Sequence, residues 1–519
     1  MYNRRNFLKL SAGTLTSALF ALQGCGADPA AAPSAATATS VLQPTPDSLP
    51  FRIAIPGTPK HFDPALYSVI EEFQMGFAIF DGLVWVDHTL TPQPLLAETW
   101  ESSNALDRWT FKLREDVLFH HGTPLTAEDV VYTFNRILDP RGNSTFRNTL
   151  SFVETVEAVD KYTVRFQLRS PSAELPVLLG APQARIVAQD YASETLDIQP
   201  SGTGPFRFVE HVPGDRVKLA RNPDYWLEDQ PQLATMEFVF VPYAQQIEQL
   251  QRGLVDMMMQ VGIADVEQLS AEPAISLAEV SGGAYQSVVL RATTKPFMDK
   301  RVREALKCCM DRRTLQQEGL HRRGELGNDH PVASISPFHA DLPLRSYDPD
   351  KARSLLTAAG YAKGIKLDLV TSTVRPGMLE LALAFKTMAQ PAGINIEVIR
   401  VPPQVYWSDY AGRVPFHTGN WGFRPSIDET FMVAYHSLAK GNESHWQNPA
   451  LDTLVEQARG EPDQQKRRDL YHQAQQLVME DGAVIIPYFL PAIVAKRTNV
   501  EGFTAHPSGW MDLRTTHLA

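Results

Sequence analysis

Cysteine is scarce in this sequence, with three residues among 519. Cys308 and Cys309 are adjacent within a helical pattern, where neighbouring side chains point apart, so a disulfide between them would be strained. We therefore expect two buried thiols there. The scarcity also excludes a disulfide-stapled fold for the body of the chain.

Long apolar runs are absent too. The run from Leu10 to Leu22 has about 13 residues, whereas a helix that spans a bilayer needs about 20. No other segment is long and apolar enough to cross a membrane. We therefore expect no membrane-spanning helix.

Positive charge is not clustered anywhere in the body of the chain. The chain has 48 Lys and Arg against 59 Asp and Glu, a net charge of −11. An acidic chain without a basic patch argues against nucleic acid and against an anionic membrane surface as partners. With 44% hydrophobic residues the chain folds, and its length implies at least two domains.

Common catalytic motifs are missing as well. The sequence has no nucleophile elbow, His-Glu-x-x-His helix, phosphate loop or Cys-x-x-Cys pair. A Ser/His/Asp triad stays open, because its members assemble in space and not in a fixed order. His120 and His121 invite a metal site, but neighbours on a strand rarely share one ion. We expect a protein that is not an enzyme and has no cofactor or metal.

The N-terminal residues resemble an export signal followed by a linker. Arg4-Arg5 with Phe7-Leu8-Lys9 resembles a twin-arginine export signal. Leu22 to Cys25 resembles a bacterial lipobox, so we expect a signal peptide at 1–24 and a lipid anchor on Cys25. Cleavage beyond Cys25, giving a soluble periplasmic protein, stays open. Residues 25–50, rich in Ala, Pro and Thr, predict a disordered linker.

The body of the chain alternates strand and helix patterns. Thr126 with Asp129 predicts a capped helix start, and Asp348-Pro349 predicts another that ends at Gly360. In the second half, a strand from Ile365, a helix from Met378 and a strand from Ile394 follow one another. Such a strand–helix–strand unit is a right-handed crossover, which predicts a mostly parallel sheet and an α/β fold.

Five motifs in order resemble one protein family. They are Phe119–Arg136, Gly202–Phe206, Asn222–Trp226, the Leu-x-x-Gly-x-x-Asp of Leu250 to Asp256, and Pro296–Leu306. The chain resembles the bacterial extracellular solute-binding proteins, family 5, which serve ABC importers for oligopeptides, dipeptides and nickel. It departs from the family pattern at His121, where Asp is usual.

The resemblance implies a two-lobed periplasmic-binding-protein fold (type II, cluster C-like) with an extra subdomain. Lobe I would hold 51–75, 200–285 and 490–519, with the subdomain at 76–199, and lobe II would hold 286–489. It also implies a periplasmic, monomeric binder that closes on a peptide-like solute and delivers it to an ABC permease in the inner membrane. A nickel, metallophore or haem receptor of the same family is the alternative.

The segment 419–428 is the expected ligand loop, because its glycines and Pro425 break any regular period. Trp421 stands where the family has a ligand-contacting Trp, and Asn420 precedes it. The family's dipeptide binders have an Asp three residues later, whereas this chain has Arg424. Such a cation favours a carboxylate or phosphate on the ligand. An ion pair of Arg424 with Asp428 or Glu429 stays open.

Four further residues are candidates for ligand contact. Asp428 could replace the carboxylate that the family's dipeptide binders have at the position of Arg424, or it could cap the start of a helix. Tyr67 and Tyr285 could stack on the ligand or pack beneath their loops. Arg291 could pair with an acid or face the cleft.

Overall fold

The computed structural model describes residues 49–191 and 193–519. The predicted signal peptide, Cys25 and all but the end of the predicted linker lie outside the described residues. Within the described ranges, no helix combines the length and apolar character that a bilayer crossing requires.

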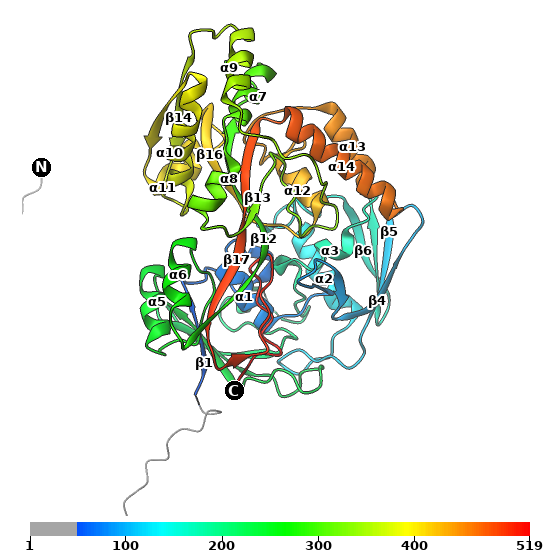
Figure 1. Cartoon of the computed structure of the whole chain (residues 1–519). Coiled ribbons are helices and arrows are strands. Elements are labelled where there is room, and N and C mark those ends of the chain that lie inside the picture. Colours follow the sequence, from blue (N-terminus) through cyan, green and yellow to red (C-terminus); the bar gives the residue numbers. More distant parts are fainter. Residues whose placement is uncertain (1–48, 192) are drawn as a thin grey trace, which may run out of the picture. The chain divides into compact units, whose positions relative to one another are not determined.

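The largest sheet has eleven strands (Figure 1). In spatial order they are β15 (Ile394–Arg400), β14 (Ile365–Thr371), β16 (Phe416–Trp421), β12 (Ile275–Leu290), β17 (Val484–Arg497), β11 (Met257–Met258), β1 (Phe51–Ile55), β10 (Thr235–Phe240), β9 (Arg216–Arg221) and β8 (Phe206–Val212), with β13 (Glu325–Leu326) paired to β17 off this path. The strand–helix–strand prediction is confirmed, because α10 (Met378–Ala389) connects β14 to β15 and these strands pair in parallel.

The prediction of a mostly parallel sheet is wrong. β1 is parallel to β10 and β11, and β14 to β15 and β16, but the other neighbouring pairs are antiparallel. The turn at 213–215 reverses the chain between β8 and β9, and a short connection of this kind produces an antiparallel pair. The parallel unit in the second half was therefore not representative of the whole sheet.

Two long strands carry the sheet through both lobes. β12 and β17 run side by side through the structure (Figure 1). Their pairing is antiparallel and shifts register between Val280 and Ala284, and again between Gln286 and Val288. On one side of the first shift β17 pairs with β11, and on the other side β12 pairs with β16. The predicted lobe boundaries at 285/286 and 489/490 fall inside these two strands. We use lobe I and lobe II with those boundaries, which remain a prediction.

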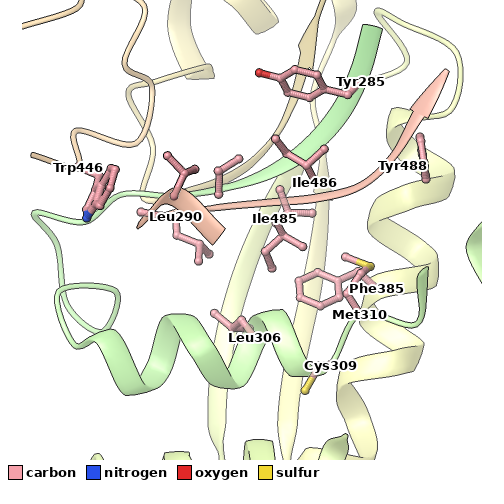
Figure 2. Packing of buried hydrophobic residues seen from close by; sticks show 14 of the residues in the cluster. Tyr285, Leu290, Leu306, Cys309, Met310, Phe385, Trp446, Ile485, Ile486 and Tyr488 are labelled. Carbon is pink, nitrogen blue, oxygen red and sulfur yellow. The ribbon is translucent and has the colours of Figure 1, made fainter. Parts of the chain in front are cut away.

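Each part of the chain has its own apolar core. One cluster of buried residues, part of which Figure 2 shows, extends along the chain from Tyr285 to Phe489. Cys308 and Cys309 are buried within it as free thiols, as predicted. A second cluster lies between Ala65 and Ala188, and contains residues of the four-stranded sheet. The strands of that sheet are β4 (Ala97–Ser102), β5 (Arg108–Leu113), β7 (Thr163–Leu168) and β6 (Val153–Asp160).

Both predicted helix starts are confirmed. Thr126 caps α2 (Ala127–Leu138), and its backbone N–H and hydroxyl both donate to the Asp129 carboxylate. Asp348 caps α9 (Pro349–Ala358) by accepting from the Lys351 N–H, and Gly360 follows with a positive φ. Besides these two and α10, the helices of eight or more residues in the described ranges are α1 (Ile70–Ile79), α5 (Tyr243–Gln251), α7 (Lys300–Cys308), α12 (Ile427–Ala434), α13 (Pro449–Arg459) and α14 (Gln464–Asp481).

Lobe II also buries an ionic cluster. Asp329 is fully buried, and its two carboxylate oxygens accept from Arg312 Nη2 at 2.6 Å and Arg345 Nε at 3.1 Å. Burial opposes ionisation of Asp329, yet Arg312, Lys307 and Arg345 hold its pKa below the ordinary value. The Asp329 carboxylate also accepts from the Ile486 N–H, which ties β17 to this cluster.

One substitution in this ionic cluster should have a large effect on the stability of the protein. Asp329→Asn leaves buried guanidinium groups without their anion, so we expect unfolding free energy to fall by about 3–5 kcal/mol. Urea denaturation measures it. Asp350→Asn, on an exposed side chain of α9, is the matched control and should change stability by less than about 0.5 kcal/mol. Equal effects of the two variants would contradict the role of the cluster.

Candidate solute-binding site

The predicted ligand loop is shorter in the structure than 419–428. Gly419 and Asn420 belong to β16, where they pair with Ser287 and Gln286 of β12. An ideal Cβ on Gly419 would lie 2.5 Å from Ser287 Oγ, so this glycine permits close strand packing and does not break the strand. Ser426 then caps α12 by accepting from the Glu429 N–H at 3.0 Å. The loop is therefore 422–426.

A small cavity of about 10 Å³ lies against this loop. Its lining residues are Gly283, Tyr285, Pro331, Trp421, Gly422, Phe423, Arg424, Thr430 and Ala434. A volume of this size holds about one water molecule. A peptide-sized solute therefore enters only if the loop moves or the lobes separate.

The ring of Phe423 fills the space beside the cavity. It rests on Gly283, where an ideal Cβ would lie 2.0 Å from Cδ2 of the ring. On its other side it packs against an aromatic cluster of lobe I that includes Phe77, Trp85 and Trp510. Phe423 thus connects the loop of lobe II to lobe I through apolar contact.

Arg424 lies between an aromatic ring and a carboxylate. Its guanidinium is 5.3 Å from the centre of the Trp421 ring, and its Nε is 3.4 Å from Glu429 Oε1. Burial raises the pKa of Glu429, and the charge of Arg424 opposes that rise. The Arg424 side chain remains 30% exposed and lines the cavity. One of the alternatives left open by the sequence, an ion pair with Glu429, is present.

Tyr285 lines the same cavity from β12. Its hydroxyl is 2.8 Å from the hydroxyl of Tyr435, and burial raises its pKa above the ordinary value. The ring packs edge to face against Phe489, in the same buried cluster. Tyr285 therefore presents a fixed, neutral aromatic surface to the cavity.

The other predicted site residues do not line this cavity. Asp428 is buried in α12, with Oδ2 3.1 Å from Arg459 Nε. Tyr67 is fully buried and donates to the Phe62 carbonyl at 3.0 Å. Arg291 donates to the Arg413 carbonyl. Asn420 lies one residue before Trp421 on β16, and successive side chains of a strand point to opposite faces.

The histidine pair forms part of a structural turn. His120 Nε2 is 2.9 Å from the Gly204 carbonyl oxygen, and His121 Nδ1 is 2.7 Å from Ser201 Oγ. Burial lowers the pKa of His120 to about 4. In the part of the chain that the structure describes, no three His, Cys, Asp or Glu side chains are placed to hold one metal ion.

Sequence reasoning missed several lining residues. Phe423 lies between two predicted residues, and its apolar character in a polar loop was a usable signal. Gly283 follows Gly282 in a strand pattern, which indicates a close approach of another group. Pro331 and Thr430 carried no signal, because only the fold brings them to the loop.

The packing of the Phe423 ring on Gly283 can be tested by substitution. Gly283→Ala places a methyl group inside the ring, so we expect a loss of about 1–3 kcal/mol in unfolding free energy. In the Phe423→Ala background the same substitution should be close to neutral, because the clash is gone. Urea denaturation of the two single variants and the double variant measures the coupling. Additive effects would show that the two residues do not contact in solution.

Comparison with known proteins identifies the relatives of this chain. The model of the bacterial extracellular solute-binding proteins, family 5 (middle region), matches residues 91–443. Heme-binding protein A of Haemophilus influenzae is 27% identical over 457 residues, which cover 80% of this chain and 82% of that protein. The dipeptide-binding protein of Escherichia coli is 25% identical over 494 residues, which cover 87% of this chain and 91% of that protein.

Solved structures show the same fold. HbpA2 from Haemophilus parasuis matches with a TM-score of 0.81 at 24% identity, covering 91% of this chain and all of that chain. AgaA from A. tumefacien R10, in complex with agropinic acid, matches with a TM-score of 0.77 at 23% identity, covering 90% of this chain and 98% of that one. The predicted two-lobed fold is confirmed by these likenesses.

Proposed function

The chain belongs to the bacterial extracellular solute-binding proteins, family 5, and we propose that it captures an anionic, peptide-like solute between its lobes. It acts as the substrate-binding component of an ABC importer. The observation that carries the ligand class is Arg424, which lines the cavity beside the Trp421 ring. Family membership supports solute binding and no enzymatic activity.

The cavity supports a mechanism of opening and closing. About 10 Å³ admits no solute, so the lobes separate before capture and close afterwards. β12 and β17 both pass from one lobe to the other near the register shift at Val280. A rotation of one lobe relative to the other would therefore bend these two strands. A solute would then take the space that the loop now fills with Phe423.

Arg424 selects the charge of the solute. Its partner in the structure is Glu429, and a bound carboxylate would compete for the same guanidinium. A guanidinium that closure takes out of water needs an anion, so a neutral solute gains less from this residue. An acidic or modified peptide, an opine-like conjugate and a glutathione-like molecule all carry such a group. Relatives named for dipeptides and a structural neighbour holding agropinic acid support this class.

A thermal-shift panel tests the proposal. We expect reduced glutathione, octopine or Ala-Glu to raise the melting temperature by a few degrees, and Ala-Gln to raise it less. Arg424→Asp should abolish the shift, and Arg424→Gln should weaken affinity about 10- to 100-fold by removing charge-assisted hydrogen bonds. Arg353→Asp, on the exposed surface of α9, is the control and should leave the shift intact. An unchanged shift in Arg424→Asp would remove the charge-selection proposal.

The alternative, a nickel, metallophore or haem receptor, is an outcome of the same panel. A relative named as a heme-binding protein gives it support. Hemin and Ni²⁺ are each added alone to the purified protein. A stoichiometric shift with either, with none from the peptides and opines, would replace the anionic-solute proposal.

We propose further that the protein is exported as a lipoprotein. Arg4-Arg5 would direct it to the twin-arginine pathway, and Cys25 would carry the lipid that holds it beside an inner-membrane permease. We propose a monomer as the working form. Intact mass spectrometry of membrane fractions should show an acylated N-terminal cysteine at position 25. Cys25→Ala should move the protein to the periplasmic fraction, and an unchanged membrane fraction would contradict the anchor.

A further inference from the structure

Glu174 of lobe I reaches the start of helix α12 in lobe II. It precedes the short helix α3 (Leu175–Leu178) and is 6% exposed. Its Oε2 accepts from the Ser426 hydroxyl at 2.5 Å and from the Asp428 N–H at 3.2 Å. Glu174 therefore holds the end of the ligand loop from the opposite lobe.

The surrounding contacts also cross between the lobes. The Ala173 N–H donates to the Arg459 carbonyl at 2.9 Å, and the Arg459 guanidinium lies 4.5 Å from the centre of the Phe152 ring. On its other side Arg459 pairs with Asp428 Oδ2. Asp428 Oδ1 is buried and has no hydrogen-bond partner among the described residues. The interface thus contains one carboxylate oxygen that lacks a donor.

Two carboxyl groups meet at this interface in a low-dielectric setting. Burial raises the pKa of Glu174 to about 7, and the charge of Asp428 adds to the rise, while the hydrogen bonds from Ser426 and Asp428 and the charge of Arg467 oppose it. Burial also raises the pKa of Asp428, which the charges of Arg459 and His436 lower.

One further titratable group faces the pair from α14. Burial raises the pKa of Tyr471 well above the ordinary value, and the charges of Asp428 and Glu174 raise it further, so this phenol stays neutral. The pair therefore faces cations at Arg459 and Arg467, a histidine at 436, and the carboxyl group of Glu429, whose pKa is raised by burial and by the charge of Asp428. A single negative charge shared by the two carboxyl groups is the favourable state near neutral pH.

A protonated Glu174 suits both of its neighbours. Its Oε2 still accepts from Ser426 and from the Asp428 N–H. In the ionised form the charge of Glu174 is opposed by that of Asp428 in a buried interface. Protonation of Glu174 thus keeps both hydrogen bonds and removes this repulsion.

We propose that Glu174 is a positioning residue for the ligand loop: when the lobes close, it docks on Ser426 and the Asp428 N–H at the start of α12 and takes up a proton from solvent, so that closure is favoured as the pH falls. The inference rests on the closing motion proposed above and not on the identity of the solute. Because Ser426 directly follows the loop, holding it also places Phe423 and Arg424 against lobe I.

The sign and size of the effect follow from proton linkage. In the separated state Glu174 is in water, with an ordinary pKa near 4.5, whereas in the closed state the pKa is about 7. At pH values between about 4.5 and 7, Glu174 is therefore protonated in the closed form but not in the open form. The stabilisation of the closed form by this proton is lost as the pH rises through 7. The equilibrium constant for closing should rise about tenfold from pH 8 to pH 6.

Pulsed electron spin resonance without solute measures this equilibrium. Spin labels are placed on the full chain at Glu157→Cys of lobe I and Gln473→Cys of lobe II, both exposed positions, with Cys25→Ser. Cys308 and Cys309 are buried and remain unlabelled. Distance distributions are compared at pH 6 and pH 8 for the labelled parent, Glu174→Gln and Glu174→Leu.

We expect the parent to close more at pH 6 than at pH 8. Glu174→Gln, which resembles the protonated acid, should be closed to the same extent at both values, and Glu174→Leu should be more open at both. Equal pH dependence in the parent and in Glu174→Gln would overturn the role of Glu174 while leaving the motion intact. A single unchanged distance in all three would overturn the motion as well, and so would the proposed mechanism of capture.

Discussion

The hydrogen-bonded pairing of β12 with β17 is the constraint on which the rest of this structure depends. Both strands run from the part of the sheet next to β11 to the part next to β16. One strand would form a loose tether, but two paired strands restrict the lobes to bending and twisting about a common line. The ladder shifts register between Val280 and Ala284 and again between Gln286 and Val288, on either side of the predicted lobe boundary at 285/286, and such irregular pairing favours bending of the strands.

The same strands position the proposed ligand site. Tyr285 lies on β12 just past the first shift, and Trp421 is its partner across the ladder on β16. The two rings are therefore fixed by backbone hydrogen bonds, whereas Phe423 and Arg424 lie on the loop that follows. In the proposed site, the two rings would supply apolar area and the loop would supply charge. Glu174 acts on the loop half only.

Local chemistry was readable from the sequence, and long-range contact was not. The caps at Thr126 and Asp348 and the unit from β14 to β15 were predicted correctly, because each depends on residues a few positions apart. The fold brings Trp421, Arg424 and Tyr285 to one cavity. Asp428 instead forms an ion pair with Arg459, 31 positions away. Gly419 was misread because a glycine in a loop and a glycine beneath a neighbouring strand look alike in sequence. Glu174 is 252 positions from Ser426, and nothing near it in the chain indicates that contact.

The ring of Phe423 on Gly283 has a consequence for how tightly any solute is held. In the proposed site the ring of Phe423 already packs on Gly283 and against the cluster of lobe I, so a solute that binds there would have to displace this ring. Measured affinity is then the difference between two occupants of similar character. The protein would then discriminate between solutes by their shape and charge, and apolar character alone would add little to affinity.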